Sequence, residues 1–165
     1  MTLAAADPAF RIHAALDRLA ADMPALGVAV SGGGDSVALM HMAADWARGR
    51  RIMAATVDHG LRPDSAAEAR QVGRAARALG LSHATLLWQR GTEAGNLMAS
   101  ARDARLRLLS GWAQRNGLSA VLLGHTADDQ AETLLLGALR GRVTGMSERS
   151  EVEGARVVRP LLGVR

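Results

Sequence analysis

The stretch Ser31-Gly-Gly-Gly-Asp-Ser36 constrains the fold more than any other part of the sequence. It follows a short apolar run, 27–30, that is typical of a buried strand, and it precedes a run, 37–42, that is typical of a helix. Consecutive glycines allow a tight turn and the close approach of a ligand to the backbone. Backbone amides in such a turn, together with the positive end of a helix dipole, favour an anion. The sequence therefore predicts an anion site between a strand and a helix.

The side chains of this stretch restrict which anion it would hold. Ser31 and Ser36 add hydroxyl donors, whereas the carboxylate of Asp35 would repel a bare phosphate and suits one that carries a divalent cation. A Walker loop is excluded because the chain contains no lysine. The dinucleotide fingerprint fails because Val37 stands where its last glycine is needed. A plain capped turn would not require three consecutive glycines, so we favour a phosphate site.

Strands and helices alternate along the rest of the chain. Helices are predicted over 8–21, 35–48, 65–79, 97–116 and 127–139. Strands are predicted over 27–31, 51–57, 82–88, 118–123 and 155–161. The glycine- and charge-rich segment 140–154 is expected to be a mobile loop. This alternation predicts an α/β fold of three layers, with a parallel five-stranded sheet and helices on both faces.

Composition fits one globular domain. The chain has 165 residues, of which 48% are hydrophobic and 22% charged. It has no cysteine, which excludes a disulfide framework, a thiolate metal site and a cysteine nucleophile. The net charge of +4 permits contact with nucleic acid, but one Phe, three Trp and no Tyr argue against an aromatic base-stacking platform. Neither a signal peptide nor a membrane span is recognisable, so a cytoplasmic location is expected.

Two more polar clusters, 58–62 and 125–132, also follow predicted strands. Because the carboxyl ends of parallel strands meet at one edge of a sheet, we expect both clusters to lie near the glycine stretch. The first contains Asp58, His59 and Arg62, which could meet the ribose or base of a nucleotide. It could equally be a loop with a satisfied histidine and a surface arginine, and the sequence leaves that choice open.

The second cluster places a histidine and three acids at the start of a predicted helix. Thr126 and Asp129 fit a capping box, which would be a structural role. A cap accounts for one or two acids, however, and the spacing of His125, Asp129 and Glu132 puts all three on one helix face. A carboxylate pair beside a phosphate loop is typical of a Mg²⁺ site. We therefore favour a functional role for this cluster.

Arginines on the predicted helix 97–116 could complete such a site. Arg102 and Arg105 are three positions apart and can face the same way. Arginine beside a phosphate stabilises charge that develops during phosphoryl or adenylyl transfer. The alternative is a solvated basic face.

With these motifs in order, the chain resembles the PP-loop ATP-pyrophosphatase superfamily and, within it, the tRNA(Ile)-lysidine synthetases. The resembling stretches are 31–36, 57–62, 101–105, 124–133 and 159–162. The resemblance implies an adenine nucleotide alpha-hydrolase-like fold. It also implies that residues 1–24 are a lead-in and that 25–165 are an ATP-binding catalytic domain without the C-terminal tRNA-binding region.

The chemistry that the resemblance implies is adenylation. The family uses ATP and Mg²⁺ to activate the C2 oxygen of the wobble cytidine of a tRNA(Ile) with a CAU anticodon, and pyrophosphate is released. Lysine then displaces AMP. The implied partners are this tRNA and lysine, no membrane is involved, and a homodimer is left open.

The resemblance also assigns roles by position. The residues expected to bind ATP are Ser31, Gly32, Gly33, Gly34, Asp35 and Ser36, with Val57 beside the adenine. Asp35 and Asp129 are expected to bind Mg²⁺, and Arg105 and His125 to lie near the α-phosphate and the reacting base. The predicted catalytic residues are Asp35, Arg105, His125 and Asp129.

The chain departs from the family pattern at Leu106, where an aromatic residue is usual, and in a shortened segment, 140–146. Two alternatives therefore stay open. One is another adenylating PP-loop enzyme, although the thiolating members commonly use cysteines that this chain lacks. The other is an ATP-binding module without turnover.

Overall fold

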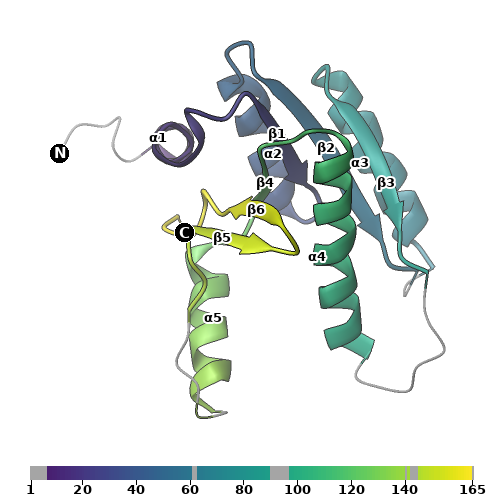
Figure 1. Ribbon diagram of the computed structural model, residues 1–165, viewed down its shortest axis with the longest axis vertical. Coiled ribbons are helices and arrows are strands. Elements are labelled where there is room, and N and C mark those ends of the chain that lie inside the picture. The colour runs from purple at the N-terminus through teal and green to yellow at the C-terminus, as the bar shows by residue number, and fades with distance from the viewer. Residues whose placement is uncertain (1–6, 61–62, 90–96, 140, 142–144, 165) are drawn as a thin grey trace.

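The computed structural model describes residues 7–60, 63–89, 97–139, 141 and 145–164, and for 97–100 it describes the backbone only. The helices are α1 (Pro8–Ala20), α2 (Gly34–Trp46), α3 (Ser65–Ala78), α4 (Leu97–Arg115) and α5 (Ala127–Ala138). The strands are β1 (Ala25–Ala29), β2 (Arg51–Asp58), β3 (Ser82–Leu87), β4 (Ala120–Leu123), β5 (Arg149–Val152) and β6 (Ala155–Val158). They form a sheet with helices on both faces, as Figure 1 shows and as the alternation predicted.

The sheet has the strand order β3-β2-β1-β4-β6-β5, and all its neighbours are parallel except β5 and β6. From β1 the chain builds outward through β2 to β3, and then crosses back to place β4 on the other side of β1. The strand order therefore reverses between β1 and β4. In open parallel sheets, ligands bind at the carboxyl ends of the strands beside such a reversal.

The five predicted parallel strands are all present, and β5 adds a sixth strand within the segment 140–154 that was expected to be a loop; residues 140 and 142–144 of that segment lie outside the described residues. Residues Arg149–Val152 form a sixth, antiparallel strand at the edge of the sheet. Their pattern gave no strand signal because only Val152 is apolar. An edge strand needs few apolar residues, since it has one neighbour and charged side chains protect its free edge. The predicted strand over 155–161 ends at Val158, and Pro160, which has no N–H to donate, lies beyond it.

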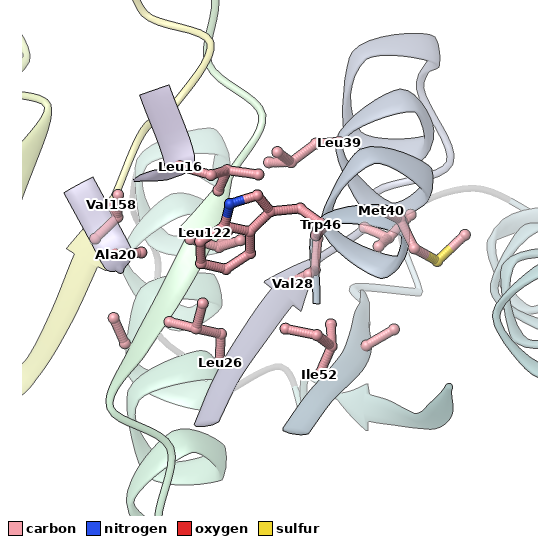
Figure 2. Close-up of a cluster of buried hydrophobic side chains, with 14 of the residues drawn as sticks. Leu16, Ala20, Leu26, Val28, Leu39, Met40, Trp46, Ile52, Leu122 and Val158 are labelled. Carbon is pink, nitrogen blue, oxygen red and sulfur yellow. The ribbon is translucent and has the colours of Figure 1, made fainter. Parts of the chain in front are cut away.

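One face of the sheet packs against α1, α2 and α3, and Figure 2 shows the part of this cluster to which α1 and α2 contribute. Leu16 of α1, Trp46 of α2 and Leu122 of β4 are fully buried in this cluster. Asp17 accepts a hydrogen bond from Trp46 Nε1 at 2.8 Å, so the one polar atom of the indole ring is satisfied. Alternate strand residues point to the opposite face, where Trp112 and Leu109 of α4 cover them.

Helix α5 differs from the other helices because it contributes no buried residue. Leu135 within α5 and Leu139 directly after it are 68% and 84% exposed, and in Figure 1 the helix extends away from the sheet. Only its first turn lies close to the sheet edge, where the Ala127 N–H donates to the carbonyl of Val164 at 3.1 Å. No helix in the described ranges is long and apolar enough to cross a lipid bilayer.

Candidate functional site

The glycine turn, residues 31–36, connects the end of β1 to α2 and is held by its own serines. The Ser36 hydroxyl donates to the Gly33 carbonyl at 2.9 Å and accepts from the Ser31 N–H at 3.1 Å. Gly32 has a backbone φ of +93°, which residues other than glycine rarely adopt. The amides of Ser31 and Gly33 donate within the turn, to Ser36 Oγ at 3.1 Å and Ser31 Oγ at 3.4 Å, so the remaining amides of the turn and the exposed Ser31 hydroxyl are the groups best placed to meet a ligand.

Gly124, directly after β4, packs against the backbone of the turn. A Cβ atom at this position would lie 3.0 Å from Cα and 3.1 Å from N of Ser36, which is too close for ordinary contact. A glycine is therefore needed to let the end of β4 approach the start of α2. This contact brings the polar cluster 125–132, which follows Gly124, beside the glycine turn, as the sequence predicted.

Two adjoining cavities lie at this end of the sheet. The smaller one, of about 290 Å³, lies between the starts of α2 and α5, and we call it the turn cavity. The larger one, of about 840 Å³, reaches from the turn across β2 to α3 and α4, and we call it the large cavity. The turn cavity is lined by Ser31, Gly33, Gly34, Asp35, Ser36, Arg105, Gly124, His125 and Asp129.

Every residue predicted to bind ATP or Mg²⁺ or to act in catalysis borders one of these cavities, whereas the exposed Glu132 of the cluster 125–132 borders neither. Gly32 and Val57 line the large cavity, and the others line the turn cavity. Ser31, Gly33, Arg105 and His125 line both, so they mark the boundary between the two. The fold thus brings together residues from β1, α2, α4 and the start of α5, while their individual roles stay predictions.

The two carboxylates of the turn cavity are suited to Mg²⁺. Asp35 is exposed in the first turn of α2 and has no hydrogen-bond partner among the described residues. Asp129 completes the capping box, because its Oδ2 accepts from the Thr126 N–H at 2.7 Å, but its Oδ1 is not engaged there. Mg²⁺ commonly takes one or two carboxylates with phosphate oxygens and water. The donor set therefore fits the cation, and the cap and the metal site are compatible.

His125 lies in a positively charged environment at the boundary. Burial lowers the pKa of its imidazole, and the nearby guanidinium groups of Arg105 and Arg159 lower it further. Its Nδ1 is buried and has no hydrogen-bond partner in the described structure. Burial also lowers the pKa of Arg105, with a smaller contribution from Arg102. These shifts favour a neutral imidazole beside a concentration of positive charge, which is suited to an anionic ligand.

Comparison with known protein families decides the assignment. The profile of the PP-loop domain family matches residues 8–165. The chain belongs to the PP-loop domain family. Figure 1 shows how this PP-loop domain is arranged: its glycine turn follows β1, and α2 begins within the turn.

The PP-loop domain is similar in sequence to curated proteins named tRNA(Ile)-lysidine synthase. It is 54% identical over 145 residues to the protein from Ruegeria pomeroyi, covering 84% of this chain and 35% of that protein. It is 50% identical over 149 residues to the protein from Bradyrhizobium diazoefficiens, covering 86% of this chain and 41% of that protein. The chain thus spans well under half the length of these two relatives. The predicted resemblance is confirmed.

Solved structures show the same fold at lower identity. The U34-tRNA thiolase NcsA from Methanococcus maripaludis superposes with a TM-score of 0.81 at 15% identity, covering 95% of this chain and 59% of that chain. The NMN synthetase from Francisella tularensis superposes with a TM-score of 0.63 at 16% identity, covering 94% of this chain and 63% of that chain. These structures confirm the predicted fold class of the PP-loop domain.

The cluster after β2 divides between structure and site. Asp58 holds its own turn: the Ser65 side chain and the Gly60 N–H both donate to it and lower the pKa of its carboxyl group. His59 lines the large cavity. Arg62 lies outside the described residues. The structural alternative therefore applies to Asp58, and His59 is the described side chain of this cluster that borders the cavity.

Arg159 is a site residue that sequence reasoning missed. It follows β6, lines the large cavity and is 8% exposed. Its position depends on β6 pairing with β4, which brings the two strand ends together across a long stretch of sequence. The only local signal is its place in the resembling stretch 159–162, which carries no predicted role.

Proposed function

We propose that this PP-loop domain is the catalytic domain of a tRNA(Ile)-lysidine synthase. In the proposed reaction the C2 oxygen of the wobble cytidine, in a tRNA(Ile) with a CAU anticodon, attacks the α-phosphorus of ATP. An oxygen–phosphorus bond forms, and pyrophosphate leaves. The ε-amine of lysine then attacks C2, a carbon–nitrogen bond forms, the carbon–oxygen bond breaks, and AMP leaves.

The observation that carries this proposal is the pair of adjoining cavities. The turn cavity combines backbone amides, the Ser31 hydroxyl and two carboxylates, which suits the pyrophosphate part of ATP. The large cavity has apolar walls at Val57 and Val72 that suit an adenosine. Arg105 and His125 stand at the boundary, where the α-phosphate of a nucleotide spanning both cavities would lie. The sequence identity to lysidine synthases directs the choice of acceptor.

In this proposal each side chain has a distinct task. The glycine turn binds and orients the leaving pyrophosphate. Mg²⁺, held by Asp35 and Asp129, would neutralise charge on the phosphates. The guanidinium of Arg105 stabilises the negative charge that develops at the α-phosphate. The neutral imidazole of His125 is available to hold a proton or to contact the reacting base.

Other PP-loop reactions make different predictions. A thiolating enzyme of the kind that uses cysteines is disfavoured, since the chain has none. A nucleotide-binding module would bind ATP without releasing pyrophosphate, even with its acceptor present. The cytoplasmic location, the lead-in over 1–24 and a homodimer stay predictions.

A chimera provides the test, because the chain is shorter than its relatives. The chain would replace the matching region of the Ruegeria pomeroyi enzyme, to which it is 54% identical. We expect the chimera to incorporate radiolabelled lysine into a tRNA(Ile) transcript with a CAU anticodon, in a reaction that requires ATP and Mg²⁺. A matched Asp129→Asn chimera should lose incorporation. A folded chimera that binds tRNA and ATP but makes no lysidine would contradict the proposal.

A further inference from the structure

Arg159 is a buried cation whose surroundings contain more positive charge than negative. Arg102, Arg105 and Arg159 all line the large cavity, and all lie close to His125, whose pKa each of them lowers. The charge of Arg102 likewise lowers the pKa of Arg159, although burial is the larger cause. Asp129 is the acid that acts on His125 in the opposite direction, and it serves the capping box. Three guanidinium groups at one cavity wall repel one another unless an anion lies between them.

The hydrogen bonds of Arg159 leave part of its guanidinium group available. Nη1 donates to the Ser147 carbonyl and to the Ser150 hydroxyl, both at 2.8 Å. Nε is buried and has no partner among the described residues. A buried unpaired donor on a charged group is costly, and its cost falls when a ligand completes the hydrogen bonding. The side chain is therefore anchored on one side, retains an unsatisfied buried donor, and lines the large cavity.

The position of Arg159 distinguishes it from the residues of the glycine turn. Arg159 and Arg102 line only the large cavity, whereas Arg105 and His125 also line the turn cavity. A pyrophosphate group in the turn cavity would therefore lie in the cavity that Arg159 and Arg102 do not line. The anion nearest to Arg159 is then the phosphate that follows the adenosine.

We propose that Arg159, assisted by Arg102, binds the α-phosphate of the adenine nucleotide and keeps hold of it after pyrophosphate has left. This inference rests on the proposed function, because it requires an adenine nucleotide in the large cavity. It extends that function by giving the AMP moiety its own anion site, separate from the pyrophosphate site at the glycine turn. The adenylated intermediate and the AMP product both carry this phosphate.

Binding measurements on the 165-residue chain test the inference with three small probes. AMP carries only the α-phosphate, pyrophosphate only the leaving group, and adenosine neither. We expect Arg159→Ala to weaken AMP binding by on the order of tenfold or more, as for a lost charge-assisted hydrogen bond. Adenosine binding and pyrophosphate binding with Mg²⁺ should change less than about twofold, which is within ordinary surface effects.

Three further variants separate this role from a structural one. Ser150→Ala removes one of the two hydrogen bonds that anchor Arg159, leaves the bond to the Ser147 carbonyl and keeps the cation, so it should affect AMP binding little. Arg102→Ala should weaken AMP binding, whereas Arg107→Ala, an exposed arginine on the same helix that lines neither cavity, should not. Thermal unfolding of each variant shows whether the fold is kept.

The outcomes are distinct. If wild-type chain binds AMP and Arg159→Ala binds it equally well, or loses pyrophosphate and AMP binding together, the inference is wrong while the nucleotide site stands. If Arg159→Ala unfolds, comparing the AMP affinities of Arg102→Ala and Arg107→Ala still tests the inference. Equal AMP affinity for those two variants overturns it. If the wild-type chain binds neither AMP nor pyrophosphate with Mg²⁺, the proposed function itself fails.

Discussion

Replacing Gly124 by alanine tests how the end of β4 positions the glycine turn. The added Cβ would lie 3.0 Å and 3.1 Å from Cα and N of Ser36, and 3.3 Å from the carbonyl carbon of Asp35. All three atoms belong to the backbone, so no side chain can rotate away to relieve the contact. The start of α2 or the end of β4 must move by a few tenths of an ångström.

The size of the effect follows from this geometry. Overpacking of a tight contact typically costs about 1–3 kcal/mol of unfolding free energy. For a chain of this length each kcal/mol lowers the melting temperature by about 2–4 °C. Because the displaced residues include Asp35 and the amide of Ser36, we also expect pyrophosphate to bind on the order of tenfold more weakly, as if one charge-assisted hydrogen bond were lost.

Gly163→Ala is the matched control. Gly163 has open space around its Cα and no positive φ, so a Cβ should be tolerated there. Circular dichroism would follow thermal unfolding, and titration calorimetry would measure binding of pyrophosphate with Mg²⁺. If Gly124→Ala melts and binds like the wild type, the close approach to Ser36 does not position the turn. If only the melting temperature falls, the contact matters for stability but not for the site.

Three further predictions concern stability. Leu16→Ala, in the buried cluster, should destabilise the fold by about 2–5 kcal/mol in denaturant titrations, whereas Leu135→Ala, on the exposed face of α5, should stay within about 0.5 kcal/mol of wild type. Folding lowers the pKa of Asp58, so its contribution to stability is present above the unfolded pKa and is lost as the pH falls through the folded value. Asp58→Asn should therefore make the unfolding free energy depend less steeply on pH in the acid range, and an unchanged slope would contradict this. Folding also lowers the pKa of His125, so the imidazole is protonated more readily in the unfolded chain, and stability should fall as the pH drops below about 6.5. His125→Gln should remove that loss, which midpoints of urea unfolding measured across this pH range would show.

The pattern of elements was predictable because each has a strong local signal. The strand that leads into Ser31 is buried along its whole length, and Asp7 caps α1 directly before Pro8 as their types suggest. The capping role of Asp129 was predictable, since a capping box is read from a few neighbouring residues, whereas its Mg²⁺ role stays a prediction. The structure shows that the cap is formed and that one carboxylate oxygen is left over.

The parts that were missed depend on contacts distant in sequence. Strand β5 consists mostly of polar residues, and it becomes a strand because Ala155–Val158 offers a free edge beside it. Arg159 becomes a site residue only because β6 pairs with β4, which sets its guanidinium among those of Arg102 and Arg105. Apart from the place of Arg159 in the resembling stretch 159–162, neither outcome has a local sequence signal, because both result from pairing between strands that are distant in sequence.

The central claim is that the two cavities adenylate a base, and transfer of the α-phosphate of ATP tests it most directly. The chimera would be incubated with α-labelled ATP, Mg²⁺ and the CAU tRNA(Ile) transcript, without lysine. We predict that the label becomes attached to the tRNA as pyrophosphate is released, that lysine then releases it as AMP, and that Asp35→Ala abolishes the transfer. If no α-label reaches the tRNA, or if a γ-label is transferred instead, the proposed chemistry is wrong.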